Sequence, residues 1–216
     1  GTKEAIVLLS GGIDSATALL LAKETYNVRA LTFEYHGVAA SELKSARAIA
    51  SWAGIAEHRF VRVPDLREAA DIPGARFDGL PSTYIPLRNS VFYSFAASYG
   101  EEVRASAIVG GHNRDDATVF ADVSQEFFAS LEKAFRMGSP IQRRLKLRLL
   151  RPLQNLTKAQ VVRLASMRGV PLGLTWSCHR DGRRHCWKCA GCLSRRAAFE
   201  KAGVEDPLTA RGGKVT

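Results

Sequence analysis

Residues 5–15 of the chain, AIVLLSGGIDS, contain a short apolar run that ends at a Ser-Gly-Gly turn. Residues 14–24, DSATALLLAKE, have the composition of a helix, so the stretch predicts a buried strand, a tight turn and a helix. Backbone N–H groups at the start of a helix are free to bind a ligand, and glycine has no side chain to block close approach. The turn is therefore suited to binding phosphate.

Two common phosphate-binding motifs are excluded at this turn. The Walker motif requires a Lys-Ser or Lys-Thr pair after its second glycine, and the dinucleotide-binding fingerprint requires a third, spaced glycine; neither follows Gly12. Residues 10–15, SGGIDS, instead match in full the SGGxDS loop of the ATP pyrophosphatase family. In the alternative interpretation the glycines only form a tight turn, and Asp14 and Ser15 cap the helix.

Strands and helices are expected to alternate along the rest of the chain. We expect strands at residues 28–33, 58–63 and 105–111, and helices at residues 41–54, 88–99, 123–136 and 156–169. The last helix has a capping box, Thr157 with Gln160. Residues 145–150, LKLRLL, alternate apolar and basic side chains like a half-exposed strand. This order predicts an α/β fold with a doubly wound, mostly parallel, Rossmann-like sheet.

The composition indicates a folded chain. It has 216 residues, of which 46% are hydrophobic, enough to bury a sizeable core. No run of 18 apolar residues is present, so we expect a soluble, cytoplasmic protein. The 31 basic and 21 acidic residues give a net charge of +10, which is compatible with nucleic acid, with nucleotide phosphates or with no charged partner.

The cysteines lie within fifteen positions near the end of the chain, at Cys178, Cys186, Cys189 and Cys192. Four thiolates on short loops suit a tetrahedral structural zinc site. His179 and His185 are rival ligands, but four cysteines complete the shell, so we expect both histidines to be exposed loop residues. We therefore predict a main domain at residues 1–170 and a zinc-binding helical unit at residues 171–216.

Two alternatives to zinc fit the cysteine pattern less well. A Cys-x-x-Cys-x-x-Cys run begins some iron–sulfur motifs, but the ferredoxin motif continues with a further Cys and Pro, whereas residues 193–195 here are Leu-Ser-Arg. Free or redox-active thiols would require four cysteines to lie close together by coincidence. Zinc is preferred over both.

Together the SGGIDS loop and the cysteine cluster resemble one branch of the ATP pyrophosphatases, the 7-cyano-7-deazaguanine synthase family. The resemblance continues through LTFEYHG (31–37), YIPLRNSVFYSFAASY (84–99), VGGHNRDDATVFADVSQEFF (109–128), RPLQNLTKAQVV (151–162) and TWSCHRDGRRHCWKCAGCLSRRAAFEKAGVEDP (175–207). It implies a fold of the adenine nucleotide alpha hydrolase type and the activity of an ATP-dependent carbon–nitrogen ligase.

The resemblance also implies a reaction and its partners. ATP adenylates the carboxylate of 7-carboxy-7-deazaguanine, and ammonia displaces AMP to give an amide. A second ATP activates the amide oxygen, whose loss leaves the nitrile used for queuosine or archaeosine. The implied cofactors are Mg²⁺ with the ATP substrate and structural Zn²⁺, and the implied assembly is a homodimer.

The resemblance assigns roles to individual residues. The residues implied for ATP binding are Leu9, Ser10, Gly11, Gly12, Asp14, Ser15, Ala16, Arg88 and Asn89. Those implied for substrate binding are Tyr35, Asn89, Gly111, Asp122 and Glu126, and the catalytic residues are Asp14, Ser15 and Lys158. In this scheme Ser10, Gly12 and Ser15 hold the β- and γ-phosphates, Asp14 helps to place Mg²⁺, and Lys158 faces phosphate. Helix capping by Arg88 and Asn89 and a solvated Lys158 are the structural alternatives.

The chain departs from the family pattern at two places. Residues 35–38 are Tyr-His-Gly-Val instead of Tyr-Gly-Gln-Arg, and residues 121–127 are ADVSQEF instead of Pro-Asp-Cys-Arg-Pro-Glu-Phe. Asp122 and Glu126 are kept. The departures motivate a second hypothesis, a ligase that joins an activated acid to an amine of a protein or nucleic acid.

A third hypothesis is an RNA-modifying or RNA-binding protein. It is motivated by the net charge and by the basic clusters at residues 143–148 and 183–184. No aromatic residue that could stack on a base interleaves with the basic residues at 145–150. Nucleic acid is therefore a possible partner that is not favoured.

Overall fold

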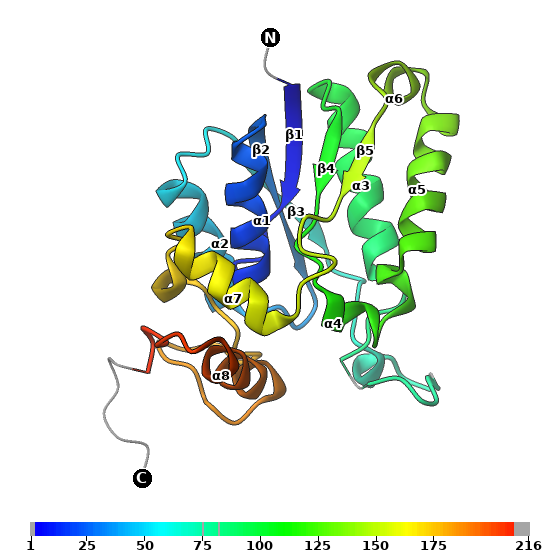
Figure 1. Cartoon of the computed structure of the whole chain (residues 1–216). Helices are drawn as coiled ribbons and strands as arrows, with labels where there is room; N and C mark the ends of the chain where they lie inside the picture. The colour runs from blue at the N-terminus through cyan, green and yellow to red at the C-terminus, as the bar shows by residue number, and fades with distance from the viewer. Residues whose placement is uncertain (1–2, 75, 82, 210–216) are drawn as a thin grey trace.

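The computed structural model describes residues 3–74, 76–81 and 83–209 and has a parallel sheet at its centre (Figure 1). Five strands pair in the order β3-β2-β1-β4-β5, all parallel. Their bounds are β1 Lys3–Leu8, β2 Tyr26–Tyr35, β3 His58–Val63, β4 Ala107–Val109 and β5 Arg148–Leu150. The predicted α/β fold with a parallel sheet is confirmed.

Helices cover both faces of this sheet (Figure 1). On one face lie α1 (Ile13–Lys23), α2 (Ala40–Trp52) and α7 (Lys158–Met167), with α8 (Ala190–Ala202) below α7. On the other lie α3 (Arg88–Glu102) and α5 (Gln125–Gly138), and α4 (Arg114–Ala117) and α6 (Pro140–Leu145) are short. Single 3₁₀ turns occur at Ala69–Asp71, Ala121–Val123 and Leu172–Leu174. Within the described ranges, no helix combines the length and the apolar character needed to cross a membrane.

The core consists of two clusters, one on each face of the sheet. Because successive side chains of a strand point to opposite faces, Ala5 and Val7 of β1 join the cluster under α1 and α7, whereas Ile6 joins the cluster under α3. Ala198 and Phe199 of α8 belong to the first cluster. The C-terminal helix therefore shares a core with the sheet domain.

A buried ion pair connects α8 with the residues that follow it near the end of the described chain. The Arg195 guanidinium, with 0% of the residue exposed, donates to both carboxylate oxygens of Asp206 at 2.6 and 2.9 Å. It also donates to the Thr175 hydroxyl and the Leu172 carbonyl. The division of the chain at residue 170 stays a prediction, and residues 1–2 and 210–216 of the two predicted units lie outside the described residues.

The prediction for residues 145–150 is only partly right. Ser139 caps a short helix that begins with Pro140 and ends at Leu145, and the backbone of the following residue, Lys146, is left-handed (φ 54°). Only Arg148–Leu150 pairs with β4. The alternating burial is nevertheless present, because Leu147 and Leu149 are buried while Lys146 and Arg148 are exposed. The capping box of Thr157 and Gln160 at the start of α7 is confirmed.

Gly11 allows the glycine turn to touch α2. It has a left-handed backbone (φ 92°), and a Cβ atom there would lie 2.5 Å from the Glu42 carbonyl oxygen and 2.8 Å from the Ala46 nitrogen. Both are backbone atoms, which cannot move aside cheaply. At Gly12, by contrast, φ is −82° and the nearest atom to such a Cβ would be the Ser10 hydroxyl at 3.5 Å.

Replacing Gly11 by alanine should therefore lower stability strongly, and Gly12→Ala serves as the matched control. Left-handed strain costs about 1–2 kcal/mol and overpacking adds about 1–3 kcal/mol. For a domain of this size this corresponds to a fall in Tm of roughly 5–15 °C. Thermal unfolding followed by circular dichroism checks it; equal melting temperatures for the two variants would contradict the packing described.

Candidate functional site

A cavity of about 270 Å³ opens beside the glycine turn. It lies at the carboxyl ends of β1 and β4, where the strand order reverses from β1-β2-β3 to β4-β5. Ligands of open α/β sheets bind at this kind of topological switch point. Of the residues predicted from the sequence, those that line the cavity are Leu9, Ser10, Gly12, Asp14, Ser15, Tyr35, Arg88, Asn89 and Gly111.

The glycine turn itself is held in shape by its two serines. The Ser15 hydroxyl accepts from the Ser10 N–H at 3.1 Å and donates to the Gly12 carbonyl at 3.2 Å. The Ser10 hydroxyl accepts from the Gly12 N–H at 3.3 Å. Helix α1 begins at Ile13, and no side chain among the described residues caps it. Its first N–H groups are therefore suited to an anionic ligand.

Asp14 and Lys158 meet at the edge of the cavity. The Lys158 ammonium donates to Asp14 Oδ2, while Asp14 Oδ1 is buried and has no hydrogen-bond partner in the described part of the chain. Asp116 lines the same cavity, and burial together with the negative charge of Asp14 raises its pKa. An unpaired carboxylate oxygen beside a second carboxylate fits a divalent cation with oxygen ligands.

Gly111 brings the end of β4 against the start of α1. A Cβ atom at Gly111 would lie 2.7 Å from the Asp14 carbonyl carbon and 2.7 Å from the Ser15 nitrogen. These are again backbone atoms. The absence of a side chain at Gly111 therefore sets how closely the two loops of the cavity approach.

Tyr35, Glu42 and Arg88 also line the cavity. Burial raises the pKa of Glu42 to about 7, although the nearby Arg88 guanidinium lowers it. Burial and the neighbouring Glu42 carboxylate raise the pKa of Tyr35 to about 12. Near neutral pH Glu42 can therefore act as a hydrogen-bond donor or as an acceptor, whereas Tyr35 keeps its proton.

Asp122 and Glu126, both predicted to bind substrate, do not line this cavity. The Asp122 carboxylate accepts from the backbone N–H of Asn89 at 3.2 Å, and the Asn89 side chain donates to the Asp122 carbonyl at 3.3 Å. Glu126 is exposed in the first turn of α5. The roles of both residues in substrate binding stay predictions. Gly11 and Ala16 are buried and are also absent from the cavity wall.

The sequence analysis missed Glu42, His112 and Asp116, which all line the cavity. His112 Nε2 is hydrogen-bonded to the buried Tyr93 hydroxyl at 3.0 Å. Burial and the positive charges of Arg88 and Arg151 lower the pKa of His112 to about 3, so its ring is neutral near pH 7. The sequence offers one signal for two of them, since His112 and Asp116 follow a buried strand within the segment 109–128.

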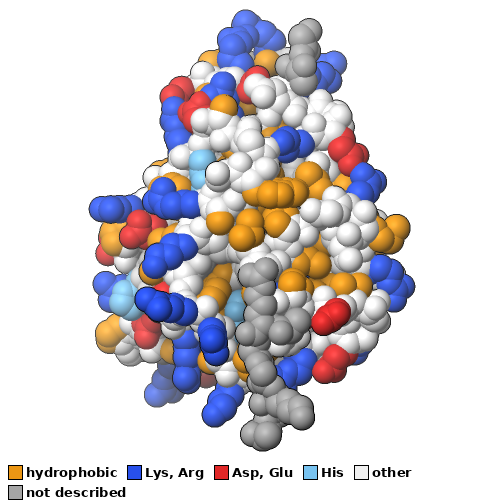
Figure 2. All heavy atoms as spheres, turned by 90° about the vertical axis from the view of Figure 1, so that its left-hand side faces the viewer, with side chains coloured by type: hydrophobic (Ala, Val, Ile, Leu, Met, Phe, Trp, Pro, Cys, Tyr) orange, Lys and Arg blue, Asp and Glu red, His pale blue; other side chains and the backbone are white. Residues whose placement is uncertain are grey.

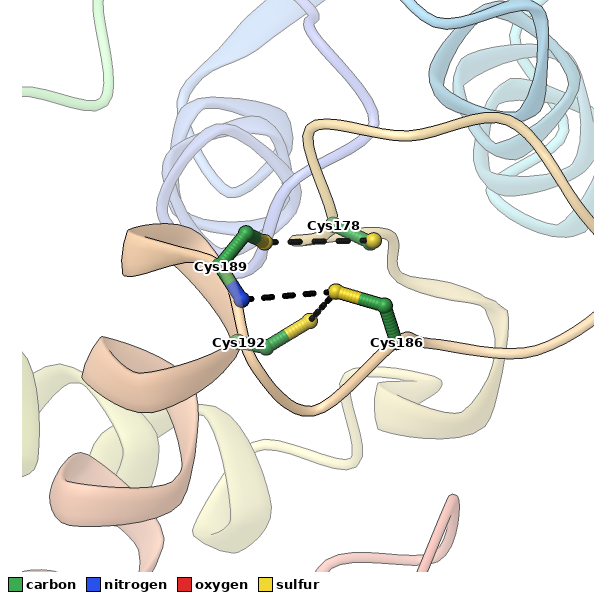
Figure 3. Close-up of side chains that lie close together, drawn as sticks. All are labelled: Cys178, Cys186, Cys189 and Cys192. Carbon is green, nitrogen blue, oxygen red and sulfur yellow. Dashed lines mark hydrogen bonds between the residues drawn. The ribbon is translucent and has the colours of Figure 1, made fainter.

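The cysteine cluster is assembled at the start of α8 (Figure 3). Cys178 and Cys186 lie on loops, Cys189 precedes α8 and Cys192 lies within it. The sulfur atoms all lie within 4.8 Å of one another, and the pairs 178–189 and 186–192 are each 3.9 Å apart. Sulfur atoms bound to one zinc ion at about 2.3 Å in a tetrahedron lie about 3.8 Å from each other. The geometry fits zinc, and these separations are far too long for disulfides.

Two backbone N–H groups support negative charge on one of these sulfur atoms, that of Cys186. The Cys186 sulfur accepts from the N–H groups of Lys188 at 3.5 Å and Cys189 at 3.3 Å. These two bonds lower the pKa of Cys186 to about 6. A thiolate is the form of cysteine that binds a metal.

The prediction that His185 is exposed is wrong. Only 7% of the residue is exposed, and its Nε2 atom accepts from the Ser177 N–H at 3.0 Å. Its ring also packs against Trp176, with centroids 4.3 Å apart. His185 is buried because its ring packs against those of Trp176 and Trp187. His179 is exposed as predicted.

Glu42 gives the free protein a specific pH dependence. Its pKa is raised from the ordinary 4.5 to about 7 in the folded state, so the folded state binds more protons than the unfolded state between these values. The contribution of Glu42 to stability is fully present below pH 4.5 and is lost as the pH rises to about 7. Glu42→Gln should therefore stabilise the ligand-free protein at pH 8 by about 1–3 kcal/mol, and by little at pH 4.5. Urea unfolding at both pH values checks this, with the exposed Glu205→Gln as the control. An equal gain at both pH values would contradict the assignment.

Comparisons with known proteins identify the family of the chain. Residues 4–203 match the family described as queuosine biosynthesis protein QueC. The protein of Thermoplasma acidophilum named 7-cyano-7-deazaguanine synthase is 37% identical over 219 residues, covering 95% of this chain and 91% of the relative. The protein of that name from Acetivibrio thermocellus is 36% identical over 217 residues, covering 95% and 97%.

Solved structures share the fold. NMN synthetase from Francisella tularensis superposes with a TM-score of 0.54 at 19% identity, covering 94% of this chain and 78% of that one. NH3-dependent NAD synthetase from Campylobacter jejuni gives a TM-score of 0.51 at 19% identity, with coverage of 80% and 66%. The match of the family over residues 4–203 and the full-length relatives assign the chain: it belongs to the QueC family of queuosine biosynthesis proteins.

Proposed function

We propose that the chain uses ATP to convert 7-carboxy-7-deazaguanine and ammonia into 7-cyano-7-deazaguanine. Full-length relatives carry the name of this synthase. The observation that carries the proposal is the complete SGGIDS loop at the switch-point cavity, with Asp14 and Lys158 beside it. The enzyme is an ATP-dependent ligase that activates a carboxylate and then an amide.

Pyrophosphate leaves ATP when the carboxylate is activated and again when the amide is activated. In both steps the negative charge that develops on the pyrophosphate has to be stabilised. The N–H groups at the start of α1 and the Lys158 ammonium are placed before the reaction, so they stabilise this charge without reorganisation. The hydroxyl network of Ser10 and Ser15 keeps the loop in the conformation that directs these N–H groups at phosphate. Mg²⁺, held by Asp14 and Asp116, would neutralise phosphate charge.

The acceptor is proposed to lie at the end of the cavity lined by Tyr35, Arg88 and Asn89. The Arg88 guanidinium complements the substrate carboxylate, and Glu42 offers a carboxyl group to the polar edge of the deazaguanine ring. Asp122 acts on this end through Asn89, because it holds the backbone N–H of that residue. A homodimer, a cytoplasmic location and the two-unit division at residue 170 also stay predictions.

Asp14→Asn should abolish production of AMP without unfolding the chain. The substitution removes the negative charge that pairs with Lys158 and that would hold the cation, but it keeps the size of the side chain. The expected loss of kcat is at least about a hundredfold, as for removal of other electrostatic groups in active sites. AMP is measured by chromatography, and the exposed Asp65→Asn is the control. Retained AMP production by a folded Asp14→Asn variant would refute the assignment.

Mass spectrometry of the products identifies the acceptor. Protein incubated with ATP, Mg²⁺, ammonium and 7-carboxy-7-deazaguanine should yield the nitrile together with AMP and pyrophosphate. If AMP appears while the acid becomes attached to a protein or nucleic acid, the chain is the alternative ligase that the departures near Asp122 suggest.

Zinc at the cysteine cluster should be structural. We expect about one zinc per chain, and its removal by a chelator should lower Tm, because the metal holds the loop before α8. Cys186→Ser should show a lower Tm that no longer responds to the chelator. Metal analysis with thermal unfolding checks this, and a wild-type melting curve unchanged by complete zinc removal would contradict the structural role.

A further inference from the structure

A second cavity, larger than the first, lies between α2 and the C-terminal segment. It has a volume of about 720 Å³, within the range of sites for small ligands. We call it the α2 groove; its walls are Ser41, Lys44, Ser45 and Ala48 of α2 and residues of the segment 173–187, together with Leu208. It shares no lining residue with the first cavity, since Glu42 of α2 faces that cavity while Ser41 and Lys44 face the groove.

The charged side chains in the wall of the groove are all basic. Lys44, Arg183 and Arg184 are exposed, and none of them pairs with a carboxylate in the part of the chain that the structure describes. Asp181 lies next to the groove, but its carboxylate accepts from the Ser41 N–H at 3.0 Å. Figure 2 shows the side of the molecule that is on the left of Figure 1, with Lys and Arg side chains gathered at its lower left. The groove is thus suited to an anion.

Aromatic rings line the groove beside these cations. Trp176 and Trp187 flank the buried His185, with centroid distances of 4.3 and 5.4 Å to its ring. The Trp176 ring N–H donates to the Cys178 carbonyl at 2.7 Å, which fixes its orientation. Flat rings beside guanidinium groups are the combination that binds a nucleobase together with its phosphate.

Hydrogen bonds between α2 and the segment before Arg183 hold the groove in a fixed shape. The Ser41 hydroxyl donates to the Gly182 carbonyl at 2.9 Å and accepts from the Gly182 N–H at 3.1 Å, so the segment before Arg183 is fixed on α2. Trp187 lies between Cys186 and Cys189, with a left-handed backbone (φ 55°). The cysteine cluster therefore positions one wall of the groove.

We propose that the α2 groove binds a nucleotide outside the active site, with the base against the tryptophan rings and the phosphate on Lys44, Arg183 and Arg184. The nucleotide is either free or part of a single-stranded RNA, since both present a base and a phosphate. No aromatic residue interleaves with the basic residues at 145–150, so the sequence alone does not favour RNA. In the structure, two tryptophan rings instead line the groove that holds the second basic cluster, at residues 183–184.

Binding is tested with two probes, uridine monophosphate and fluorescein-labelled pentauridylate, by titration calorimetry and fluorescence anisotropy. A parallel titration uses Arg88→Ala, which changes the first cavity and should leave the affinity for both probes unchanged if they bind in the groove. Arg183→Ala/Arg184→Ala should weaken binding by at least about tenfold, because charge-assisted bonds to phosphate are lost. The matched control, Arg143→Ala/Arg144→Ala, removes the same charge from an exposed pair elsewhere and should change affinity less than about twofold.

Two further variants separate the parts of the site. Trp187→Leu should weaken binding by about fivefold or more through lost stacking. Lys44→Ala removes the basic side chain that α2 contributes to the groove and should also weaken binding. This variant tests the site even if the Arg183→Ala/Arg184→Ala variant fails to fold. For pentauridylate, loss of two phosphate contacts should reduce the slope of log K against log salt by about 1.4.

The outcomes are distinct. Tighter binding of pentauridylate than of the mononucleotide identifies RNA as the source, and equal affinity identifies a free nucleotide; both support the groove. Equal weakening by the two double variants, loss of binding in Arg88→Ala, or no binding of either probe at 1 mM would overturn the proposal. If the chain proves to make no nitrile, the groove is untouched, because its variants are compared by affinity alone.

Discussion

Two hydrogen bonds to one carbonyl oxygen connect the parts of this protein on which its chemistry depends. The Gly11 carbonyl accepts from the Ser45 hydroxyl of α2 at 3.0 Å and from the backbone N–H of Trp176 at 2.9 Å. Both depend on the missing side chain at Gly11, since a Cβ atom would collide with the backbone of α2. The glycine turn is thus bonded to α2 and to the segment that leads into the cysteine cluster, which begins two residues after Trp176.

The cavity beside the glycine turn is lined by charged side chains that are not fully paired with one another. Asp14 and Asp116 lie close together, and in the part of the chain that the structure describes Lys158 is the one side chain that donates to Asp14. Arg88 and Glu42 line the same cavity. Burying carboxylates without full pairing costs free energy, and proteins retain such arrangements where a ligand compensates for them. The same helix, α2, turns Glu42 to this cavity and Lys44 to the basic groove, so one short element separates an acidic site from a basic one.

The sequence predicted the features that depend on neighbouring residues. The strand, turn and helix around SGGIDS, the capping box at Thr157 and the cysteine cluster follow from local spacing, and the structure has all three. It did not predict Glu42, because a carboxylate on an amphipathic helix looks solvated until the fold places it against the glycine turn. Likewise, the burial of His185 depends on packing against Trp176, which spacing along the chain does not reveal. Strand and helix lengths near residues 140–150 depended on a proline-initiated helix that the alternating pattern concealed.

The contact between Asp122 and Asn89 has a consequence for how substrate preference can evolve. Asp122 lies outside the cavity, but its carboxylate accepts a hydrogen bond from the backbone N–H of Asn89 in the first turn of α3. Both Arg88 and Asn89, which line the cavity, belong to this turn. Substitutions in the segment 121–127 can therefore tilt this turn while every residue in the cavity wall stays the same. Substrate preference can therefore change through residues that lie outside the cavity wall, because they set the position of residues that lie in it.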